Sequence, residues 1–228
     1  YSMLFEDGLI LNGYLISTIV TVTGTAFAIF FCSMCGFAIS QARMKHRNKL
    51  AMYLYLPIIF NVGLIPWYIN IAYTLQLKGT IFALIMPPLI APFNIFLSRN
   101  YFKSIPESLS ECAQMEGASD FLLFFKIMFP LALPINATLI FFIAIGYWND
   151  WYLAVWFIEN ERSLFPLQYV IYRVQSVIDN LRQMGLSELP EQTISAASMF
   201  LAMGPLILVY PYLQKYFVKG IMVGGVKG

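Results

Sequence analysis

Five long stretches of this chain contain no charged residue, and they limit the folds that are open to it. Crossing about 30 Å of hydrocarbon takes roughly 20 helical residues, and each stretch reaches that length. Backbone polar groups in lipid need partners within their own segment, so helices are the expected form. We therefore predict an all-α membrane protein with one domain over 1–228. Its five transmembrane helices are expected at about 9–40, 50–77, 79–98, 120–150 and 192–215.

The composition is typical of a chain that is embedded in a lipid bilayer. Hydrophobic residues make up 59% of it and charged residues 11%, whereas a soluble domain carries roughly 25% charged residues. The net charge is +2, and no basic stripe with interleaved aromatic residues indicates a nucleic-acid partner. We expect membrane lipid around the chain and no nucleic acid bound to it.

The distribution of Lys and Arg predicts the orientation. Ten of the 14 fall in the segments 43–49, 99–126 and 215–227. Loops rich in Lys and Arg stay in the cytoplasm. The loop 99–119 and the C-terminus are therefore expected inside, and the N-terminus and the loop 151–191 outside.

Prolines interrupt the predicted helices and are expected to kink them. This is common in membrane helices, and it also suits a bundle that bends around a transport pathway. The prolines within the five predicted helices are Pro57, Pro66, Pro87, Pro88, Pro92, Pro130, Pro134, Pro205 and Pro211.

A short amphipathic helix is predicted in the cytoplasmic loop. Ser104 and Glu107 have capping-box spacing, and Pro106 falls in the first turn, where a missing N–H costs little. The side chains that recur on one face are Ile105, Leu109, Cys112 and Ala113. Gly117 is expected to end this helix with a positive φ, in a turn that fits only a residue without a β-carbon. Ser119 is expected to cap the next helix.

The same loop resembles a known family. Glu111-Cys112-Ala113 is followed after three residues by Gly117, and after nine more by Ile127, one residue, Phe129 and Pro130. This pattern resembles the EAA loop of permeases in binding-protein-dependent ABC importers of the type I fold. Cys112, Glu116 and Phe129 are mild departures from it. The resemblance implies that Glu107 to Gly117 docks in a cytoplasmic ATP-binding subunit. The residues it implicates are Glu107, Glu111, Ala113, Glu116 and Gly117.

Two further elements resemble carbohydrate-uptake permeases of the maltose type. They are Trp148-Asn149-Asp150 and the tail, in which Lys219, Gly224, Gly225 and Lys227 are expected to contact the ATPase. The resemblance implies a heterodimer with a second permease, a pair of cytoplasmic ATP-binding subunits that carry ATP and Mg, and an extracellular solute-binding protein. This chain would bind no cofactor itself. It also implies a bacterial inner-membrane location and a sixth helix before Tyr1.

Polar side chains near membrane depth are candidates for the solute pathway. Such groups usually face a bundle interior or a cavity, but each also has the chemistry to bridge two helices. The candidates are Asn61, Asn94, Asn136, Trp148, Asn149 and Asp150. In the outer loop, apolar residues from Leu167 to Leu181 recur at helical spacing. The helix they predict would cap the pathway, contact the solute-binding protein or simply pack on its neighbours.

Several patterns carry no function. Cys32 and Cys35 have CxxC spacing but lie inside a hydrophobic helix, and His46 has no partner ligands for a metal. The chain has no P-loop, so ATP hydrolysis is expected on another subunit and this chain is not an enzyme. The alternatives left open are an importer of amino acids, phosphonates or peptides, and a membrane channel or scaffold.

Overall fold

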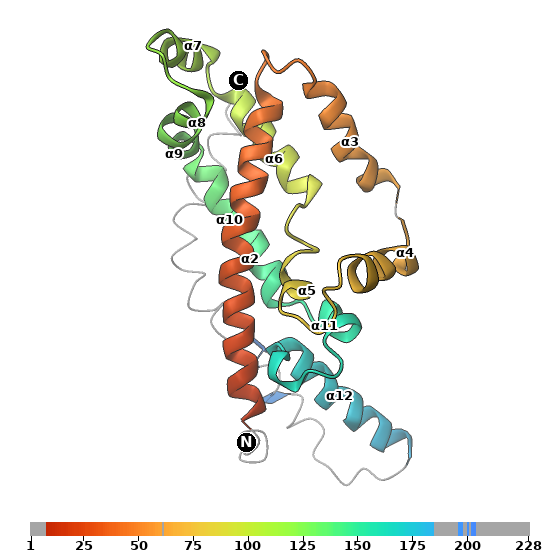
Figure 1. The fold of residues 1–228 in the computed structure, drawn as a ribbon. Helices are drawn as coiled ribbons and strands as arrows, with labels where there is room; N and C mark the ends of the chain where they lie inside the picture. The colour runs from red at the N-terminus through yellow and green to blue at the C-terminus, as the bar shows by residue number, and fades with distance from the viewer. Residues whose placement is uncertain (1–7, 61, 185–195, 198–199, 201, 204–228) are drawn as a thin grey trace, which may run out of the picture. The chain divides into compact units, whose positions relative to one another are not determined.

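The computed structural model describes residues 8–60, 62–184, 196–197, 200 and 202–203, and every regular element in this part of the chain is helical (Figure 1). The contacts divide into two compact units. Unit 1 contains the described parts of Tyr1–Gly24, Leu64–Pro87 and Ala144–Pro211, and unit 2 those of Thr25–Gly63 and Pro88–Ile143. Two long helices, α2 and α10, contribute residues to both units.

Unit 1 consists of the first half of α2 and several further helical elements. α2 spans Leu9–Ser40 and has the bounds predicted for the first helix. The other elements of the unit are α4 (Leu64–Ile69), the π-helix η1 (Asn70–Thr74), α5 (Phe82–Ile85), the end of α10 (Leu133–Trp148), α11 (Tyr152–Phe157), the 3-10 turn η3 (Arg162–Leu164) and α12 (Leu167–Gln183).

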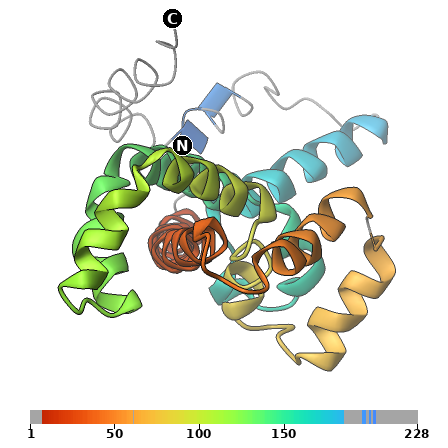
Figure 2. The ribbon, with the colours of Figure 1, turned by 90° about the horizontal axis from the view of Figure 1, so that it is seen from above.

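Unit 2 surrounds the second half of α2. Seen along α2, the segment α7 to α9 lies on one side of it and α3 on the other (Figure 2). The elements of the unit are α3 (Arg47–Ile59), α6 (Pro92–Ser104), α7 (Glu107–Met115), α8 (Asp120–Leu122), the π-helix η2 (Leu123–Met128), α9 (Phe129–Leu131) and most of α10. Its larger apolar core is formed by the buried residues Phe37, Phe102, Ala113, Leu123, Phe124, Met128 and Ala132.

The helix predicted over 79–98 is not continuous in the structure. α5 ends at Ile85, and α6 begins at Pro92 after a non-helical connection. Pro87 and Pro88 lack the N–H groups that a helix needs, and a residue before proline is driven towards extended backbone. Ala91, which precedes Pro92, accordingly has φ −90° and ψ 112°. Pro92 then opens α6, which continues to Ser104 and so takes up the start of the predicted loop 99–119.

Two other predicted helices are interrupted. The 50–77 segment divides into α3 and α4–η1, with Gly63 at φ 80° in the break. The 120–150 segment turns by 81° at Ala132, between the helices Asp120–Leu131 and Leu133–Trp148. Pro134 explains that corner, because its ring cannot be placed against the carbonyl four residues earlier in a straight helix.

In the part of the chain that is described, the helices support fewer membrane spans than the five that were predicted. α2 alone is long and apolar enough to cross a membrane, and up to three spans result if each interrupted pair is counted as one. The predicted 192–215 helix lies mostly outside the described residues.

Candidate functional site

The short helix α7 is built from local signals. It spans Glu107–Met115, with Pro106 at the N-cap and the acidic Glu107 in the first turn, where the helix dipole favours a negative charge. The predicted capping box does not form. Ser104 still belongs to α6, and its hydroxyl donates to the Tyr101 carbonyl at 2.7 Å. Glu107, Glu111 and Glu116 are all exposed.

The turn after α7 depends on Gly117. Its φ is 85°, the left-handed conformation that only glycine adopts without cost. Two hydrogen bonds close the turn, from Ala118 N–H to the Ala113 carbonyl at 3.0 Å and from Gly117 N–H to the Gln114 carbonyl at 2.9 Å. Together they make a Schellman motif, which satisfies the last carbonyls of the helix. A β-carbon on Gly117 would meet nothing within 4 Å, so the backbone conformation, and not lack of space, requires glycine here.

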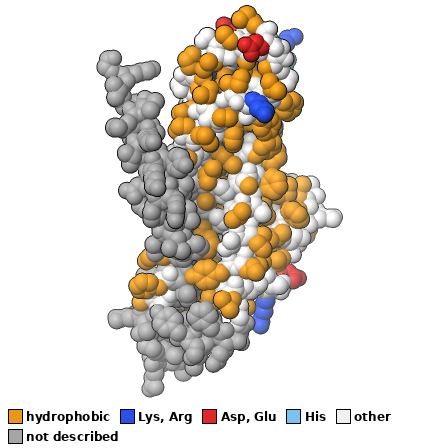
Figure 3. All heavy atoms as spheres, turned by 90° about the vertical axis from the view of Figure 1, so that its left-hand side faces the viewer, with side chains coloured by type: hydrophobic (Ala, Val, Ile, Leu, Met, Phe, Trp, Pro, Cys, Tyr) orange, Lys and Arg blue, Asp and Glu red, His pale blue; other side chains and the backbone are white. Residues whose placement is uncertain are grey.

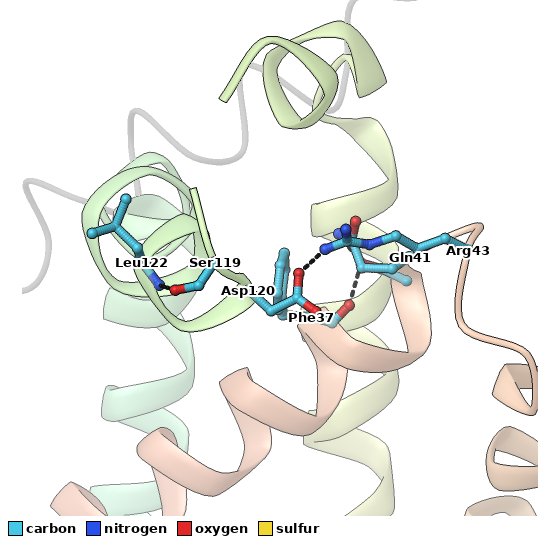
Figure 4. Close-up of polar contacts among 7 residues, drawn as sticks. Phe37, Gln41, Arg43, Ser119, Asp120 and Leu122 are labelled. Carbon is cyan, nitrogen blue, oxygen red and sulfur yellow. Dashed lines mark hydrogen bonds and ion pairs between the residues drawn. The ribbon is translucent and has the colours of Figure 1, made fainter. Parts of the chain in front are cut away.

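The next helix begins as predicted and is connected to the end of α2. The Ser119 hydroxyl accepts a hydrogen bond from Leu122 N–H at 3.3 Å and so caps α8. Asp120, in the first turn, forms an ion pair with Arg43 from the loop after α2 (Figure 4). Both charged side chains are largely exposed, so the pair contributes about 1 kcal/mol at most to stability. The pair joins the loop that follows α2 to the turn between α7 and α8.

The packed face of α7 agrees with the predicted one in part, since Ile105 and Ala113 pack against the core while Leu109 and Cys112 do not. Ser110 and Ala113 are its buried residues, and Ala113 joins the apolar core of unit 2 with Phe102 and Phe124. Leu109 is 43% exposed, and Cys112 is exposed too. Small side chains let α7 lie close against the aromatic core, and that choice of face comes from tertiary packing, which the helical period alone does not determine.

The outer face of α7 combines acidic and apolar side chains. Glu107, Glu111 and Glu116 are exposed there, and Met115 is 82% exposed beside them. In the next helix, Phe121 and Leu122 are exposed as well. Apolar side chains gathered at a polar end of a protein are typical of a surface that another protein covers. On the face seen in Figure 3, the acidic and basic side chains of unit 2 gather at the end where α7 lies, and hydrophobic side chains cover the rest of the unit.

A hollow of about 490 Å³ lies beside this turn. Its walls come from the end of α2, the loop that follows it and α8, so a displacement of α8 against α2 changes its volume. Phe37, Gln41, Arg43 and Asp120 are seen around it in Figure 4. The other lining residues are Met34, Ala38, Met44, Phe121 and Phe124.

Two of the predicted pathway residues lie on unit 2. Asn136 is 1% exposed. Its Oδ1 accepts from the Ser33 hydroxyl at 3.1 Å and its Nδ2 donates to the Phe129 carbonyl at 3.5 Å, so it connects α2 to the α9–α10 corner. Asn94 is half-buried on α6. Asn61 lies outside the described residues.

The three residues of the Trp148-Asn149-Asp150 element make contacts with different partners. Trp148 is buried, and its Nε1–H donates to the Ala202 carbonyl at 3.0 Å. The Asp150 carboxylate accepts from Leu153 N–H at 3.0 Å, at the start of α11. Asn149 is exposed, and its Oδ1 accepts from the side chain of Gln168 at 3.3 Å. Of the three, only Asn149 presents its side chain to the surroundings.

The predicted loop 151–191 contains the predicted helix, α12, together with residues that the sequence analysis missed. Its first turn packs through Leu167 and Val170, which are buried. Gln168 and Tyr172 lie one turn apart on it and contact Asn149 and Trp151. Their spacing of four residues was the available signal, but their partners lie about twenty residues away in the chain. The tail residues Lys219, Gly224, Gly225 and Lys227 lie outside the described residues.

Comparisons with known proteins cover almost the whole chain. Residues 14–223 match the family described as "Binding-protein-dependent transport system inner membrane component". The polygalacturonan/rhamnogalacturonan transport system permease protein YtcP of Bacillus subtilis is 36% identical over 100% of this chain and 81% of its own length. The arabinooligosaccharides transport system permease protein AraQ of Halalkalibacterium halodurans is 28% identical over 98% of this chain and 76% of its own.

A solved structure has the same fold. It is the crystal structure of a bacterial ABC transporter involved in the import of the acidic polysaccharide alginate. The match has a TM-score of 0.84 at 29% identity, and it covers 95% of this chain and 78% of that one.

Proposed function

Because the chain belongs to the family of binding-protein-dependent transport system inner membrane components, we propose that it is a permease subunit of an ATP-driven carbohydrate importer. The chain is thus a component of a transport system, and the carbohydrate is the proposed part. The names of several relatives support it, since they include polygalacturonan, arabinooligosaccharides and melibiose. The substrate here is an oligosaccharide.

One observation carries the proposed mechanism. α7, the proposed coupling helix, has one packed face and one exposed face, and a Schellman turn joins it to the next helix. α7 docks through its exposed face, with Glu107 and Glu111 meeting cations of an ATP-binding subunit. Ala113 fixes α7 to the core of unit 2. Closure of the ATP-binding pair therefore moves α7 and α8 together, and alternating access follows in the membrane helices.

The proposed topology has five crossings, with the N-terminus outside and the C-terminus inside a bacterial inner membrane. The position of the basic residues supports it, since the loops 43–49 and 99–126 are the Lys- and Arg-rich ones. α2 is the first crossing. The segments α3 with α4–η1 and α8–α9 with α10 are crossings made of two parts, which membrane helices allow where neighbours satisfy the freed backbone groups.

The proposed assembly contains a second, different permease, a pair of ATP-binding subunits and an extracellular solute-binding protein. ATP and Mg lie on the ATP-binding pair and no cofactor on this chain. The tail, with Lys219 and Lys227, adds a contact to the ATPase. Asn94 and Asn149 remain the pathway candidates that are accessible, whereas Asn136 and Trp148 are assigned to helix contacts.

Reconstitution tests this function. The complex is purified from native membranes in mild detergent, its subunits are identified by mass spectrometry, and it is placed in liposomes with the solute-binding protein. Uptake is measured for neutral and acidic oligosaccharides, an amino acid and a short peptide. We expect uptake of an oligosaccharide that needs both ATP and the binding protein. Recovery of the chain alone, or uptake that proceeds without ATP, contradicts the proposal.

A further inference from the structure

Two contacts, one helical turn apart, connect α12 to the turn that follows α10. Gln168 Nε2 donates to Asn149 Oδ1 at 3.3 Å. The rings of Trp151 and Tyr172 stack with centroids 4.4 Å apart and an interplanar angle of 15°. Residues four apart on a helix lie on the same face. The amide pair and the ring pair therefore lie next to each other on unit 1.

The groups in this cluster remain accessible. Trp151 is 40% and Tyr172 39% exposed, Asn149 is exposed and Gln168 is half-buried. Within the described residues, Gln168 Nε2 donates to Asn149 and to the Ala202 carbonyl. No other described residue bonds Asn149 Nδ2 or Gln168 Oε1. The amide pair thus offers one donor and one acceptor beside two stacked rings.

The residues on either side of Asn149 hold its backbone in position beside α12. Trp148 and Asp150 use their polar atoms on Ala202 and Leu153, so the turn 148–150 is fixed from both sides of Asn149. On the next turn of α12, the Arg173 guanidinium lies over the Phe165 ring, 5.2 Å from its centroid. The cluster of four residues itself contains no charged side chain.

We propose that Asn149, Gln168, Trp151 and Tyr172 form a saccharide subsite on the outer side of unit 1. A sugar ring presents an apolar C–H face and hydroxyls that both donate and accept. Its face stacks on the accessible surface of the Trp151–Tyr172 pair, and its hydroxyls bind Asn149 Nδ2 and Gln168 Oε1. Recognition in a site of this kind comes from a few convergent polar groups beside apolar surface. The proposal rests on the carbohydrate-import function above and names the residues that read the sugar.

The subsite recognises ring and hydroxyl geometry, because no charged group belongs to it. Two other roles are available to aromatic residues at this place. Interfacial Trp and Tyr anchor membrane proteins at the headgroup level, and an exposed apolar patch is also a docking surface for a protein. Neither role needs a free amide donor and acceptor beside the rings, and both are distinguishable by experiment.

The test uses the reconstituted transporter and the oligosaccharide that the wild-type complex takes up. The variants are Tyr172→Ala, which removes one ring, and Asn149→Ala, which removes the amide. Tyr73→Ala is the matched control, since Tyr73 is a 68% exposed tyrosine of the same unit outside the cluster. We expect KM for uptake to rise about tenfold in each cluster variant, the change that about 1.4 kcal/mol of lost binding produces. The control should leave KM unchanged.

Two further measurements identify the alternatives. The affinity of the sugar-free binding protein for the complex should stay at the wild-type value in all variants, and so should Tm of the complex in detergent. An unchanged KM in both cluster variants overturns the proposal. Loss of affinity for the sugar-free binding protein overturns it in favour of protein docking. A lower Tm at unchanged KM overturns it in favour of membrane anchoring. Failure of the wild-type complex to import any oligosaccharide is the separate failure of the proposed function.

Discussion

Gly117 and Gly36 are required for different physical reasons, although both are glycines of unit 2. Gly117 has φ 85° and open space around its α-carbon. Gly36 lies in the last turns of α2, where a β-carbon would be 2.8 Å from Ser98 Cβ and 2.9 Å from Arg99 N. The first constraint is conformational and the second is steric. They predict different effects of substitution.

Gly117→Ala should cost about 1 kcal/mol, the penalty of a left-handed conformation for a residue with a β-carbon. Gly117→Asn should cost less, because Asn tolerates that conformation. The cost acts at the α7–α8 turn, so we expect fewer sugar molecules imported per ATP hydrolysed in the order Gly, Asn, Ala. Gly146→Ala is the control, since Gly146 lies within the helix α10 with nothing within 4 Å of an added β-carbon. An equal number of sugar molecules imported per ATP in all variants would contradict the role assigned to the turn.

The Ser33–Asn136 hydrogen bond should contribute to stability and not to substrate affinity. Removal of either side chain leaves a buried polar group without its partner. In membrane proteins such interhelical bonds couple by about 0.6 kcal/mol in double-mutant cycles. A cycle of Ser33→Ala and Asn136→Ala, read by thermal unfolding in detergent, measures this coupling. An altered KM for uptake at unchanged Tm would instead place Asn136 on the pathway.

Among the elements, α2 and α6 are brought together by small residues. Because the atoms that a β-carbon on Gly36 would meet include backbone, the two helices must separate in Gly36→Ala. Overpacking of this kind typically costs about 1–3 kcal/mol. We expect a lower Tm of the purified complex, with partial recovery when Ser98→Gly is added, because that change removes the Ser98 side chain. A Tm equal to that of Gly146→Ala would contradict the close approach.

The elements that the sequence predicted correctly are those that local signals determine. α2 was predicted from an uninterrupted apolar stretch, the end of α7 from Gly117, and the start of α8 from Ser119. The 79–98 helix was wrong because Pro87 and Pro88 end it, and hydropathy alone does not register missing N–H groups. The buried face of α7 was predicted in part. Ala113 is buried and Ile105 packs on the same core, whereas Leu109 and Cys112 are exposed and Ser110 is buried, a choice that the helical period leaves open. The neighbours of Asn149 were missed because α12 is distant in the sequence.

For the whole molecule, labelling of the three cysteines can test how the chain is oriented in the membrane. Cys112 is exposed on α7, Cys32 is buried and Cys35 is half-buried on α2. A membrane-impermeant maleimide should label Cys112 in inside-out vesicles and leave the chain unlabelled in right-side-out vesicles. Assembly with the ATP-binding subunits should slow the reaction, because α7 is then covered.

A second cysteine variant is expected to be labelled from the other side of the membrane. Asn180 is exposed on α12, so Asn180→Cys in a Cys112→Ser background should be labelled only in right-side-out vesicles. Labelling of Cys112 from the outside would reverse the proposed topology and with it the assignment of α7 to the ATPase.

The π-helical segment η2 has a consequence for how the length of this chain can change. Its backbone bonds run over five residues, as from Phe129 N–H to the Phe124 carbonyl, so this turn holds one residue more than an α-helical turn. Loss of one residue within Leu123–Met128 therefore converts the segment to a regular helix and keeps the elements on both sides in register. The same loss in the middle of α2 rotates every later side chain by about 100°, since an α-helix has 3.6 residues per turn. η2 is thus a place where a one-residue deletion is absorbed, a few residues after a turn whose conformation favours glycine.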